Sequence, residues 1–414
     1  MVLLHYLETI AHQPMFTLWQ ELIQCVVFRI LMTILSNHIM KPLPLLLLLL
    51  LLLPLGGCRP DPPPLAADGA QAASRTLIVY LGGDNNLSSE SFQKLEALQL
   101  ALVQNPILAH PAASILVYHD PATASGALPS LWRLTTAGPQ LIQRYPLENS
   151  ASAEVLARVV ARCQAEAPAQ SYGLWLFSHA SGWLPPHTLG SPRSVVVDGS
   201  SEMELADLAR AIPDSTFEFI VFEACFMSGI EVAYELRHKT RYLLASSAEI
   251  LSPGFTTLYG SLLPPLWDLS SQHDSQKALA SVAQAYYHSR NQASADNRSA
   301  TISLIRTAPL EPLAAQLRAW GLHFPRDPQT LLAIQHFDRH PHGRHLFFDL
   351  RHLLQTICTP AQMATLDAML SRVVLLRLAT PTFMPSLGGF TIHSHSGLTT
   401  YIPQPQFPYL NSAY

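Results

Sequence analysis

Short apolar runs alternate with stretches of helical periodicity along most of this chain, from residue 75 onward. Runs of β-branched and other apolar residues that are bounded by turn-forming residues are typical of buried strands. Such runs cover residues 76–81, 115–118, 131–134, 172–177, 217–222, 242–246 and 300–305, and 131–134 has the character of a hairpin arm. The chain therefore supplies enough strands for one large sheet.

The stretches between these runs carry apolar residues at the spacing of one helix face. They cover residues 88–102, 153–167, 202–212, 229–239, 275–290 and 308–322. Ser88 or Ser89 is expected to cap the first of these helices. A strand–helix–strand rhythm favours a mostly parallel sheet with helices on both faces. We therefore expect residues 75–414 to form one α/β unit, a three-layer α/β/α sandwich with a helical carboxyl-terminal elaboration.

Two of the predicted strands are followed by residues that can perform chemistry. His179 comes directly after the strand 172–177, and Cys225 comes directly after the strand 217–222. The carboxyl ends of parallel strands share one edge of a sheet, where open α/β folds place their active sites. A thiol becomes a good nucleophile beside a base, and imidazole is a usual partner. The pattern predicts a cysteine hydrolase with a His179–Cys225 dyad.

Composition narrows the class of protein without changing this picture. The net charge of -4 and the absence of a dense Lys/Arg stripe argue against a nucleic-acid partner. The five cysteines are scattered, so they predict neither a disulfide framework nor a CxxC zinc site. A single disulfide bridge is an alternative if the domain lies outside the cytoplasm.

The hydrophobic content of 49% comes partly from a leucine tract near the amino terminus. Lys41 precedes this tract, which spans residues 42–54 and ends in the small residues before Cys58. A basic start, a short apolar stretch and small residues describe a secretory signal, and the tract is short for a membrane-spanning helix. Residues 40–57 are therefore expected to be a signal peptide, with an uncleaved helix as the alternative.

The Leu55–Cys58 ending resembles the lipobox of bacterial lipoproteins. This resemblance implies cleavage before Cys58, lipidation of its thiol and a membrane anchor. Arg59 follows in place of Asp, which favours the outer membrane of the bacterial cell envelope. Residues 58–74 are rich in Pro, Ala and Asp and are expected to tether the domain flexibly.

Residues 1–39 precede a complete signal, so we expect Met40 to be the natural start and 1–39 to be a non-native extension. The alternative is a first membrane helix over residues 16–35. Glu21 and Arg29 weaken that alternative, because charged residues are costly in a bilayer.

Several motifs accompany the His179 and Cys225 segments. The most specific is 219–236 around Cys225, and others are 80–87, 177–183, 197–208, 245–254 and 396–403. Together they resemble the clostripain-type cysteine peptidases, which are relatives of caspases, legumains and gingipains. The resemblance covers residues 75–414 and implies a caspase-like peptidase domain that acts on peptide or protein substrates.

The resemblance also implies roles for individual residues. His179 would be the base and Cys225 the nucleophile, with the backbone N–H groups of Ala180 and Cys225 stabilising the oxyanion. Ser246 lies in a segment that resembles the substrate-binding wall. Glu223 stands two residues before Cys225, where the family usually has an Asp that is implicated in binding Arg or Lys at the cleaved bond.

Two departures keep a second function open. Ala180 replaces the family's usual Gly, and Glu223 adds a methylene to the usual Asp. Either change is compatible with a catalytically inactive lipoprotein that binds peptides or a partner protein. With Glu223, a preference for Arg or Lys persists as a hypothesis, because a carboxylate–guanidinium pair is sensitive to geometry.

Other candidate sites carry weaker signals. A dense group of His336, His340, His342 and His345 with Asp338 and Asp349 has metal-ligand chemistry, but Pro341 and Gly343 interrupt it. We interpret it as a solvated loop and assign no metal site, and Asp349 is expected to start a helix. Asp84 and Asp198 suit turns and caps as well as a site. No cofactor is required for the predicted chemistry, and calcium dependence, which occurs among relatives, stays undecided.

Overall fold

The computed structural model describes residues 73–110, 113–186, 188, 195–267, 275–325, 327–340 and 344–414. They belong to one compact unit, Gln71–Tyr414. Residues 1–39, the predicted signal 40–57 and the predicted lipidation site Cys58 lie outside the described residues. The predicted tether 58–74 overlaps the first strand at its last two positions, because that strand begins at Ala73. None of the helices formed by the described residues is long and apolar enough to cross a membrane.

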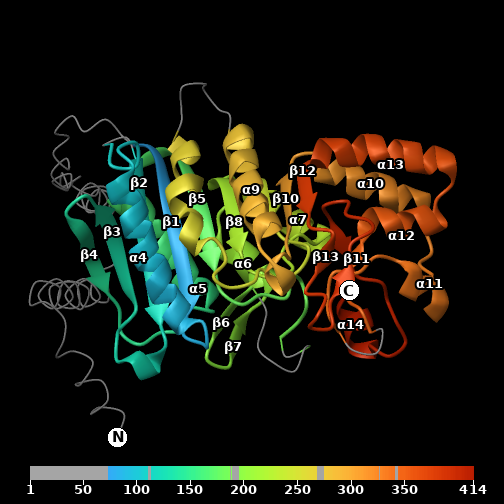
Figure 1. Cartoon of the computed structure of the whole chain (residues 1–414), viewed down its shortest axis with the longest axis horizontal. Coiled ribbons are helices and arrows are strands. Elements are labelled where there is room, and N and C mark those ends of the chain that lie inside the picture. The colour runs from blue at the N-terminus through green and yellow to red at the C-terminus, as the bar shows by residue number, and fades with distance from the viewer. Residues whose placement is uncertain are drawn as a thin grey trace, which may run out of the picture. The chain divides into compact units, whose positions relative to one another are not determined.

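A nine-stranded sheet forms the centre of the unit, in the order β12-β10-β9-β8-β5-β1-β2-β3-β4 (Figure 1). Its central five strands are parallel: β9 (Thr240–Ala245), β8 (Phe217–Glu223), β5 (Ala169–Phe177), β1 (Ala73–Gly83) and β2 (Ala113–Pro121). Antiparallel strands complete both edges: β3 (Ser130–Thr135) and β4 (Gly138–Arg144) on one side, β10 (Thr301–Arg306) and β12 (Val374–Ala379) on the other. The strands of the parallel centre are mostly apolar because helices cover both of their faces.

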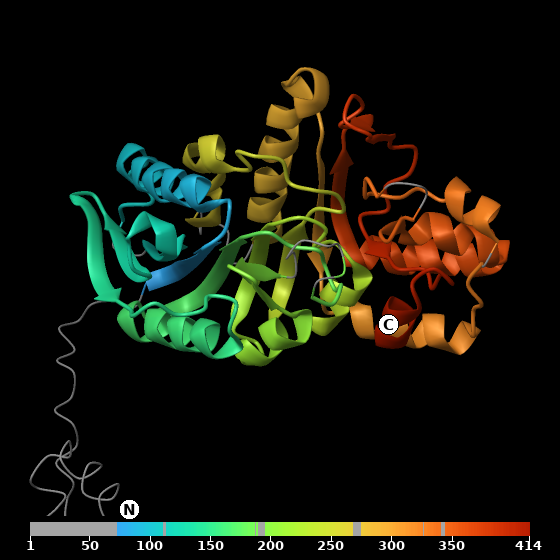
Figure 2. The same ribbon diagram turned by 90° about the horizontal axis from the view of Figure 1, so that it is seen from below.

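Helices lie on both faces of the sheet, which confirms the predicted α/β/α sandwich (Figure 2). One face is covered by α4 (Ser88–Gln104), α8 (Tyr259–Leu262) and α9 (Ser275–Gln292), and the other by α5 (Ala153–Glu166), α6 (Leu205–Ala211) and α7 (Ile230–Glu235). Beyond the β12 edge lie the elements of the predicted carboxyl-terminal elaboration: α10 (Leu310–Trp320), α11 (Pro328–Ala333), α12 (Leu350–Ile357), α13 (Pro360–Val373) and α14 (Pro408–Ala413).

In the described part of the chain, three short strand pairs lie outside the large sheet. They are β6 (Val196–Asp198) with β7 (Ser201–Met203), β11 (Phe348–Asp349) with β15 (Thr399–Thr400), and β13 (Thr382–Phe383) with β14 (Phe390–Thr391). The segment 396–403, which resembles a late strand of the family, contains β15. This strand pairs with β11, outside the main sheet.

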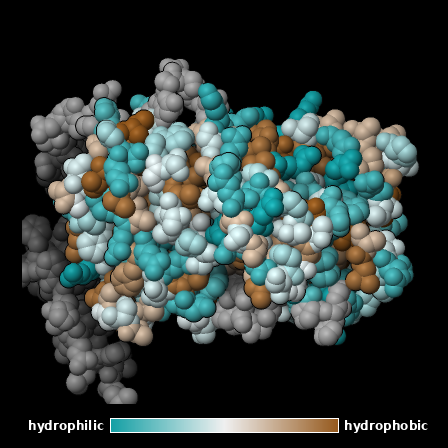
Figure 3. All heavy atoms as spheres, in the orientation of Figure 1, coloured by the Kyte–Doolittle hydropathy of each residue, from teal (hydrophilic) through white to brown (hydrophobic). Residues whose placement is uncertain are grey.

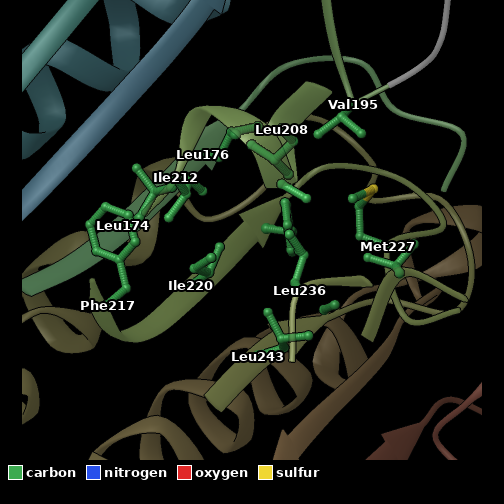
Figure 4. Close-up of a cluster of buried hydrophobic side chains, with 14 of the residues drawn as sticks. Leu174, Leu176, Val195, Leu208, Ile212, Phe217, Ile220, Met227, Leu236 and Leu243 are labelled. Atoms are coloured by element: carbon green, nitrogen blue, oxygen red, sulfur yellow. The ribbon is translucent and has the colours of Figure 1, made fainter. Parts of the chain in front are cut away.

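The core beneath α6 and α7 shows why the strand and helix patterns converge on one fold. Leu174 and Leu176 of β5, Ile220 of β8 and Leu243 of β9 point toward the helices on this face (Figure 4). Each is fully buried, and burying a Leu or Ile side chain contributes about 1.5–3 kcal/mol. On the outside, apolar side chains are scattered among polar ones in the view of Figure 3.

The element boundaries differ from the sequence pattern at three places. Leu87 is the N-cap of α4 without a side-chain bond, so neither Ser88 nor Ser89 caps it. The helix predicted from 202 begins at Leu205, because residues 201–203 pair with β6. The helix predicted over 229–239 spans only Ile230–Glu235. Asp349, by contrast, is confirmed as a helix start, because its carboxylate accepts from His352 N at 2.8 Å.

Candidate active site

The register between β5 and β8 brings His179 and Cys225 to one edge of the sheet. Phe177, the last residue of β5, lies opposite Glu223, the last residue of β8, in a parallel ladder. His179 and Cys225 each follow two residues later, on neighbouring loops at the carboxyl ends of the strands. The predicted juxtaposition at this edge is therefore what the structure shows.

Both side chains line one pocket of about 210 Å³. The pocket is formed by the start of α4, the loops after β5 and β8, and the segment after β9; its lining residues are Leu87, Glu90, Phe177, Ser178, His179, Glu223, Ala224, Cys225, Glu249, Ile250, Leu251, Ser252 and Gly254. The segment that resembles the substrate wall thus does form one wall. A larger hollow of about 830 Å³ lies at the opposite edge, among the amino-terminal ends of β5, β8 and β9. The larger hollow is not the expected active site, because active sites of parallel sheets lie at the carboxyl ends of the strands.

Asn86 orients the imidazole of His179. The ring nitrogen Nε2 lies 2.5 Å from Asn86 Oδ1, and because an amide oxygen only accepts, Nε2 carries the hydrogen. In the neutral ring, Nδ1 then holds the lone pair that a base needs. Asn86 belongs to the turn after β1, which neighbours β5 in the sheet. The sequence pattern predicts a turn at Asn86 and does not indicate this contact with His179.

The His179 loop and the Cys225 loop pack against each other without room for an extra atom. Gly182 has φ +66°, and a Cβ there would lie 2.8 Å from the carbonyl oxygen of Phe226. Phe226, directly after Cys225, has a φ of 60°, which is uncommon for a residue with a side chain. Its ring stacks on Phe347 with centroids 4.4 Å apart. This packing fixes the two loops relative to each other.

The remaining predicted site residues lie at or near this edge. Ala180 is 1% exposed and directly follows His179, and its predicted oxyanion role stays a prediction. Ser246 is fully buried, contacts Thr301 Oγ1 at 2.8 Å and is not among the residues that line the pocket. Its predicted contact with substrate stays a prediction.

The carboxylate of Glu223 is occupied by four internal donors. Its Oε1 accepts from Lys94 Nζ at 2.5 Å and from Phe255 N at 2.6 Å. Its Oε2 accepts from Tyr259 Oη at 2.7 Å and from Trp175 Nε1 at 2.9 Å. A carboxylate offers about four lone-pair sites. The acid that the family resemblance assigns to substrate recognition is thus fully satisfied within the protein.

Lys94 is the partner that the sequence did not reveal. Its ammonium is fully buried and also contacts Thr256 Oγ1 at 2.7 Å and Glu90 Oε1 at 3.1 Å. Lys94 carries one positive charge between the two carboxylates of Glu90 and Glu223, so the group has one net negative charge. Of these three side chains, that of Glu90 is exposed, by 12% of its surface, and the other two are fully buried. Burial raises the pKa of Tyr259, and the Glu223 charge raises it further, so this phenol stays a donor.

Other predicted groups have structural partners. Asp84 accepts from Thr123 N at 3.0 Å, and Asp198 accepts from Ser150 N at 2.5 Å, so both carboxylates order turns. Among the described cysteines, Cys163, Cys225 and Cys358 carry thiols and form no bridge. Of the histidine group, the structure brings His336 and His345 together with Asp338, whereas His342 lies outside the described residues.

A sequence model of the clostripain family matches residues 79–323, which is more than half of the chain. The chain belongs to the clostripain family of cysteine proteases. No curated protein matches the chain. An inactive zymogen C11 protease from Parabacteroides distasonis is 28% identical, covering 83% of this chain and 96% of its own, with a TM-score of 0.69.

A second solved structure agrees with this assignment. A secreted C11 cysteine protease from Bacteroides thetaiotaomicron, in complex with an irreversible peptide inhibitor, is 27% identical with a TM-score of 0.66. The match covers 80% of this chain and 93% of that one. The clostripain-family fold and the cysteine-protease class, both expected from the sequence motifs, are thereby confirmed.

Proposed function

We propose that this clostripain-family chain is an endopeptidase in which Cys225 is the nucleophile and His179 is the general acid and base. The observation that supports this most directly is the Phe177–Glu223 register, which sets both side chains at the edge of one pocket. A cysteine and a histidine on one pocket wall are the groups that acyl transfer through a thiolate needs.

The reaction follows from these two groups. The Cys225 thiolate attacks the scissile carbonyl carbon, and the carbon–nitrogen bond breaks as His179 gives its proton to the leaving amine. Water then attacks the thioester while His179 takes a proton from it, and the acid product leaves as Cys225 is restored. The N–H groups of Ala180 and Cys225 are the proposed oxyanion donors, and removal of one such donor costs about 3 kcal/mol in the transition state.

We assign selectivity for a basic side chain to Glu90, whereas Glu223 is structural. All four lone-pair sites of Glu223 are taken, so a substrate guanidinium would have to displace an internal donor. Glu90 lines the same pocket, is partly exposed and carries the unbalanced charge of the Glu90–Lys94–Glu223 group. A partly exposed carboxylate in a small pocket favours Arg or Lys over neutral residues.

We propose that the enzyme lies outside the cytoplasm and that a lipid on Cys58 holds it to the outer membrane. The leucine tract and the Leu55–Cys58 ending support it. That the relative from Bacteroides thetaiotaomicron is a secreted protease also supports export. A Cys58→Ala variant is expected to lose its lipid and to leave the membrane fraction; a variant that stays there would contradict the anchor.

The test of the dyad uses the full chain and Cys225→Ala as its control, with a peptide library varied at the residue before the cut. Cleavage that the control lacks supports the proposal. Absence of cleavage, together with an unreactive Cys225 thiol, would favour the alternative of an inactive peptide-binding lipoprotein. Repeating the assay with and without calcium tests cation dependence.

Selectivity is tested on the same library with Glu90→Gln. We expect the preference for Arg or Lys over norleucine to fall about tenfold or more, the usual scale for losing a charged hydrogen bond. An exposed control, Glu96→Gln on the same helix, should keep it. An unchanged preference in Glu90→Gln would reject the assignment while leaving the dyad intact.

A further inference from the structure

Two antiparallel segments beside the active-site loops carry a group of metal-type ligands. His336 and Phe348 form a β-bridge, and Phe337 N donates to Phe347 O at 2.9 Å. This pairing brings His336 and Asp338 of the first segment next to His345 of the second. One ligand atom from each of the three residues lies within 4.8 Å of the other two.

The two imidazoles are held face to face, and the hydrogen bond of one fixes its tautomer. The rings of His336 and His345 have centroids 3.3 Å apart and an interplanar angle of 7°. His336 Nδ1 lies 3.0 Å from the backbone oxygen of Asp338, which can only accept, so Nδ1 carries the hydrogen. Nε2 is then the nitrogen with a lone pair. Metal-bound histidines commonly donate their other ring N–H to such a carbonyl.

Asp338 and His345 supply the second reason to expect a cation. Asp338 is 6% exposed, and the hydrogen bonds that its carboxylate accepts from described residues are long, at 3.3 Å from Leu346 N and Phe347 N. His345 Nδ1 lies 3.5 Å from Asp338 Oδ2 and is a buried nitrogen without a hydrogen-bond partner. Buried polar atoms are nearly always satisfied, so an exception calls for a missing partner such as an ion.

We propose that His336, Asp338 and His345 bind a divalent transition-metal ion of the zinc class. Two imidazoles and one carboxylate are the borderline-soft donors that Zn²⁺ and its neighbours select, with water completing the coordination. Calcium prefers an all-oxygen shell, so this group should not take it. Metal binding would require the two rings to turn out of their parallel stack, so that the lone pairs of both point toward one ion.

The proposed site is coupled to the pocket through its neighbours in sequence. Arg339, directly after Asp338, pairs with the pocket-lining Glu249 through Nε and Nη2 at 2.7 and 3.0 Å. Phe347, two residues after His345, stacks on Phe226 beside Cys225. An ion that joins the two segments would therefore stiffen both contacts.

The test is a Zn²⁺ titration of the metal-depleted full chain by calorimetry, in a Cys225→Ala background. That background removes the active-site thiol, which binds zinc on its own account. We expect one equivalent to bind and its affinity to fall at least about tenfold in His336→Gln and in His345→Gln. His340→Gln, in the same stretch of chain, and the exposed His323→Gln are the matched controls and should bind as the parent does.

Two further readouts separate a ligand from a merely structural residue. One equivalent of zinc should raise the Tm of the parent and of both controls but not of the two ligand variants. Co²⁺ should give visible absorption bands in the parent that the ligand variants lack. No stoichiometric uptake by the parent, or equal affinity in His336→Gln and His345→Gln, would overturn the proposal. Tight calcium binding at these residues would overturn the choice of metal.

Discussion

At the scale of single residues, the site depends on two groups that local sequence does not single out. Asn86 fixes the His179 ring, and Lys94 neutralises Glu223 from the interior of α4. Both are remote in sequence from the residues that they serve. Their roles follow from the sheet, which places the turn after β1 and the start of α4 beside the β5 and β8 loops.

Replacing Asn86 by Ala should lower kcat/KM about tenfold to a hundredfold, because the imidazole loses the acceptor that fixes its tautomer. The effect should fall mainly on kcat, and the lower limb of the pH–rate profile should move. Asn86→Asp keeps an acceptor oxygen and should retain more activity than Asn86→Ala. Equal activity in Asn86→Ala and the parent protein would contradict this positioning role.

Replacing Lys94 by Met should destabilise the fold by about 3–5 kcal/mol, because the buried Glu223 charge loses its partner. Urea unfolding measures this, with the exposed Lys277→Met as the control. Adding Glu223→Gln to Lys94→Met should recover much of the loss, since only the partly exposed Glu90 carboxylate then lacks its ammonium partner. A loss below about 1 kcal/mol would show that the pair is not isolated from solvent.

At the scale of elements, the His179 and Cys225 loops behave as one packed body. Gly182 is the contact point, because a Cβ there meets the Phe226 carbonyl. The left-handed backbone of Gly182 and the uncommon φ of Phe226 lie on facing loops, so neither loop can shift alone. Backbone strain at such sites persists only where the surroundings hold it.

Gly182→Ala should therefore cost more stability and more activity than Gly126→Ala. Both glycines have positive φ, so an alanine at either position costs about 1–2 kcal/mol for the left-handed conformation. Only Gly182 also has backbone within 2.8 Å of the new Cβ, while Gly126 has open space. Comparing Tm and kcat/KM of the two variants isolates the contact. Equal losses would mean that the loops are free to separate.

The elements that could be predicted from sequence are those whose pattern is local. The strands that position the site are continuous apolar runs, because both faces of the sheet are buried. Their predicted bounds lie within a few residues of the observed ones. The His179–Cys225 pair followed from the strand ends. Strand β12 was missed, since its residues are only partly buried and alternate irregularly. The predicted α4 cap is wrong, because Ser88 Oγ accepts from Ala122 N and not from an N–H group of the helix.

The parts of the site that could not be predicted depend on long-range contacts. The family resemblance implies a substrate-binding role for Glu223, but it does not reveal that its carboxylate contacts Lys94, Phe255 and Tyr259, each far from it along the chain. No periodicity encodes such a contact. The histidine group shows the same limit, because it takes the antiparallel pairing to select His336 and His345 from the described candidates His336, His340 and His345.

At the scale of the whole molecule, stability should depend on a buried carboxyl group at the end of β2. Burial, with a further contribution from Asp198, raises the pKa of Asp120 from its usual 3.8 to about 8. Between these values the folded chain keeps a proton that the unfolded chain loses. The contribution of Asp120 to the unfolding free energy is thus full below about pH 4 and is lost as the pH rises through about 8.

Asp120→Asn removes this titration, so the variant should lose less stability than the parent between pH 5 and pH 8. Urea unfolding at the two pH values measures the difference. The control Asp214→Asn alters a carboxylate whose pKa is lowered, chiefly by its hydrogen bond from Lys239. Asp214 is ionised in both states over this range, so the control should follow the parent. The same loss in parent and Asp120→Asn would exclude Asp120 as the source.

The strand order has a consequence for how the protein is made. β1 lies inside the sheet, β2, β3 and β4 extend it on one side, and β5, β8, β9, β10 and β12 extend it on the other, each in order of synthesis. A chain that emerges amino-terminal end first can therefore add every new strand to an edge that already exists, with no insertion between paired strands. The imidazole and the thiol meet once β8 has docked, before residues 249–254 have emerged to close the pocket wall. Until that wall arrives, the nascent enzyme holds its reactive pair without a place to bind the chains around it.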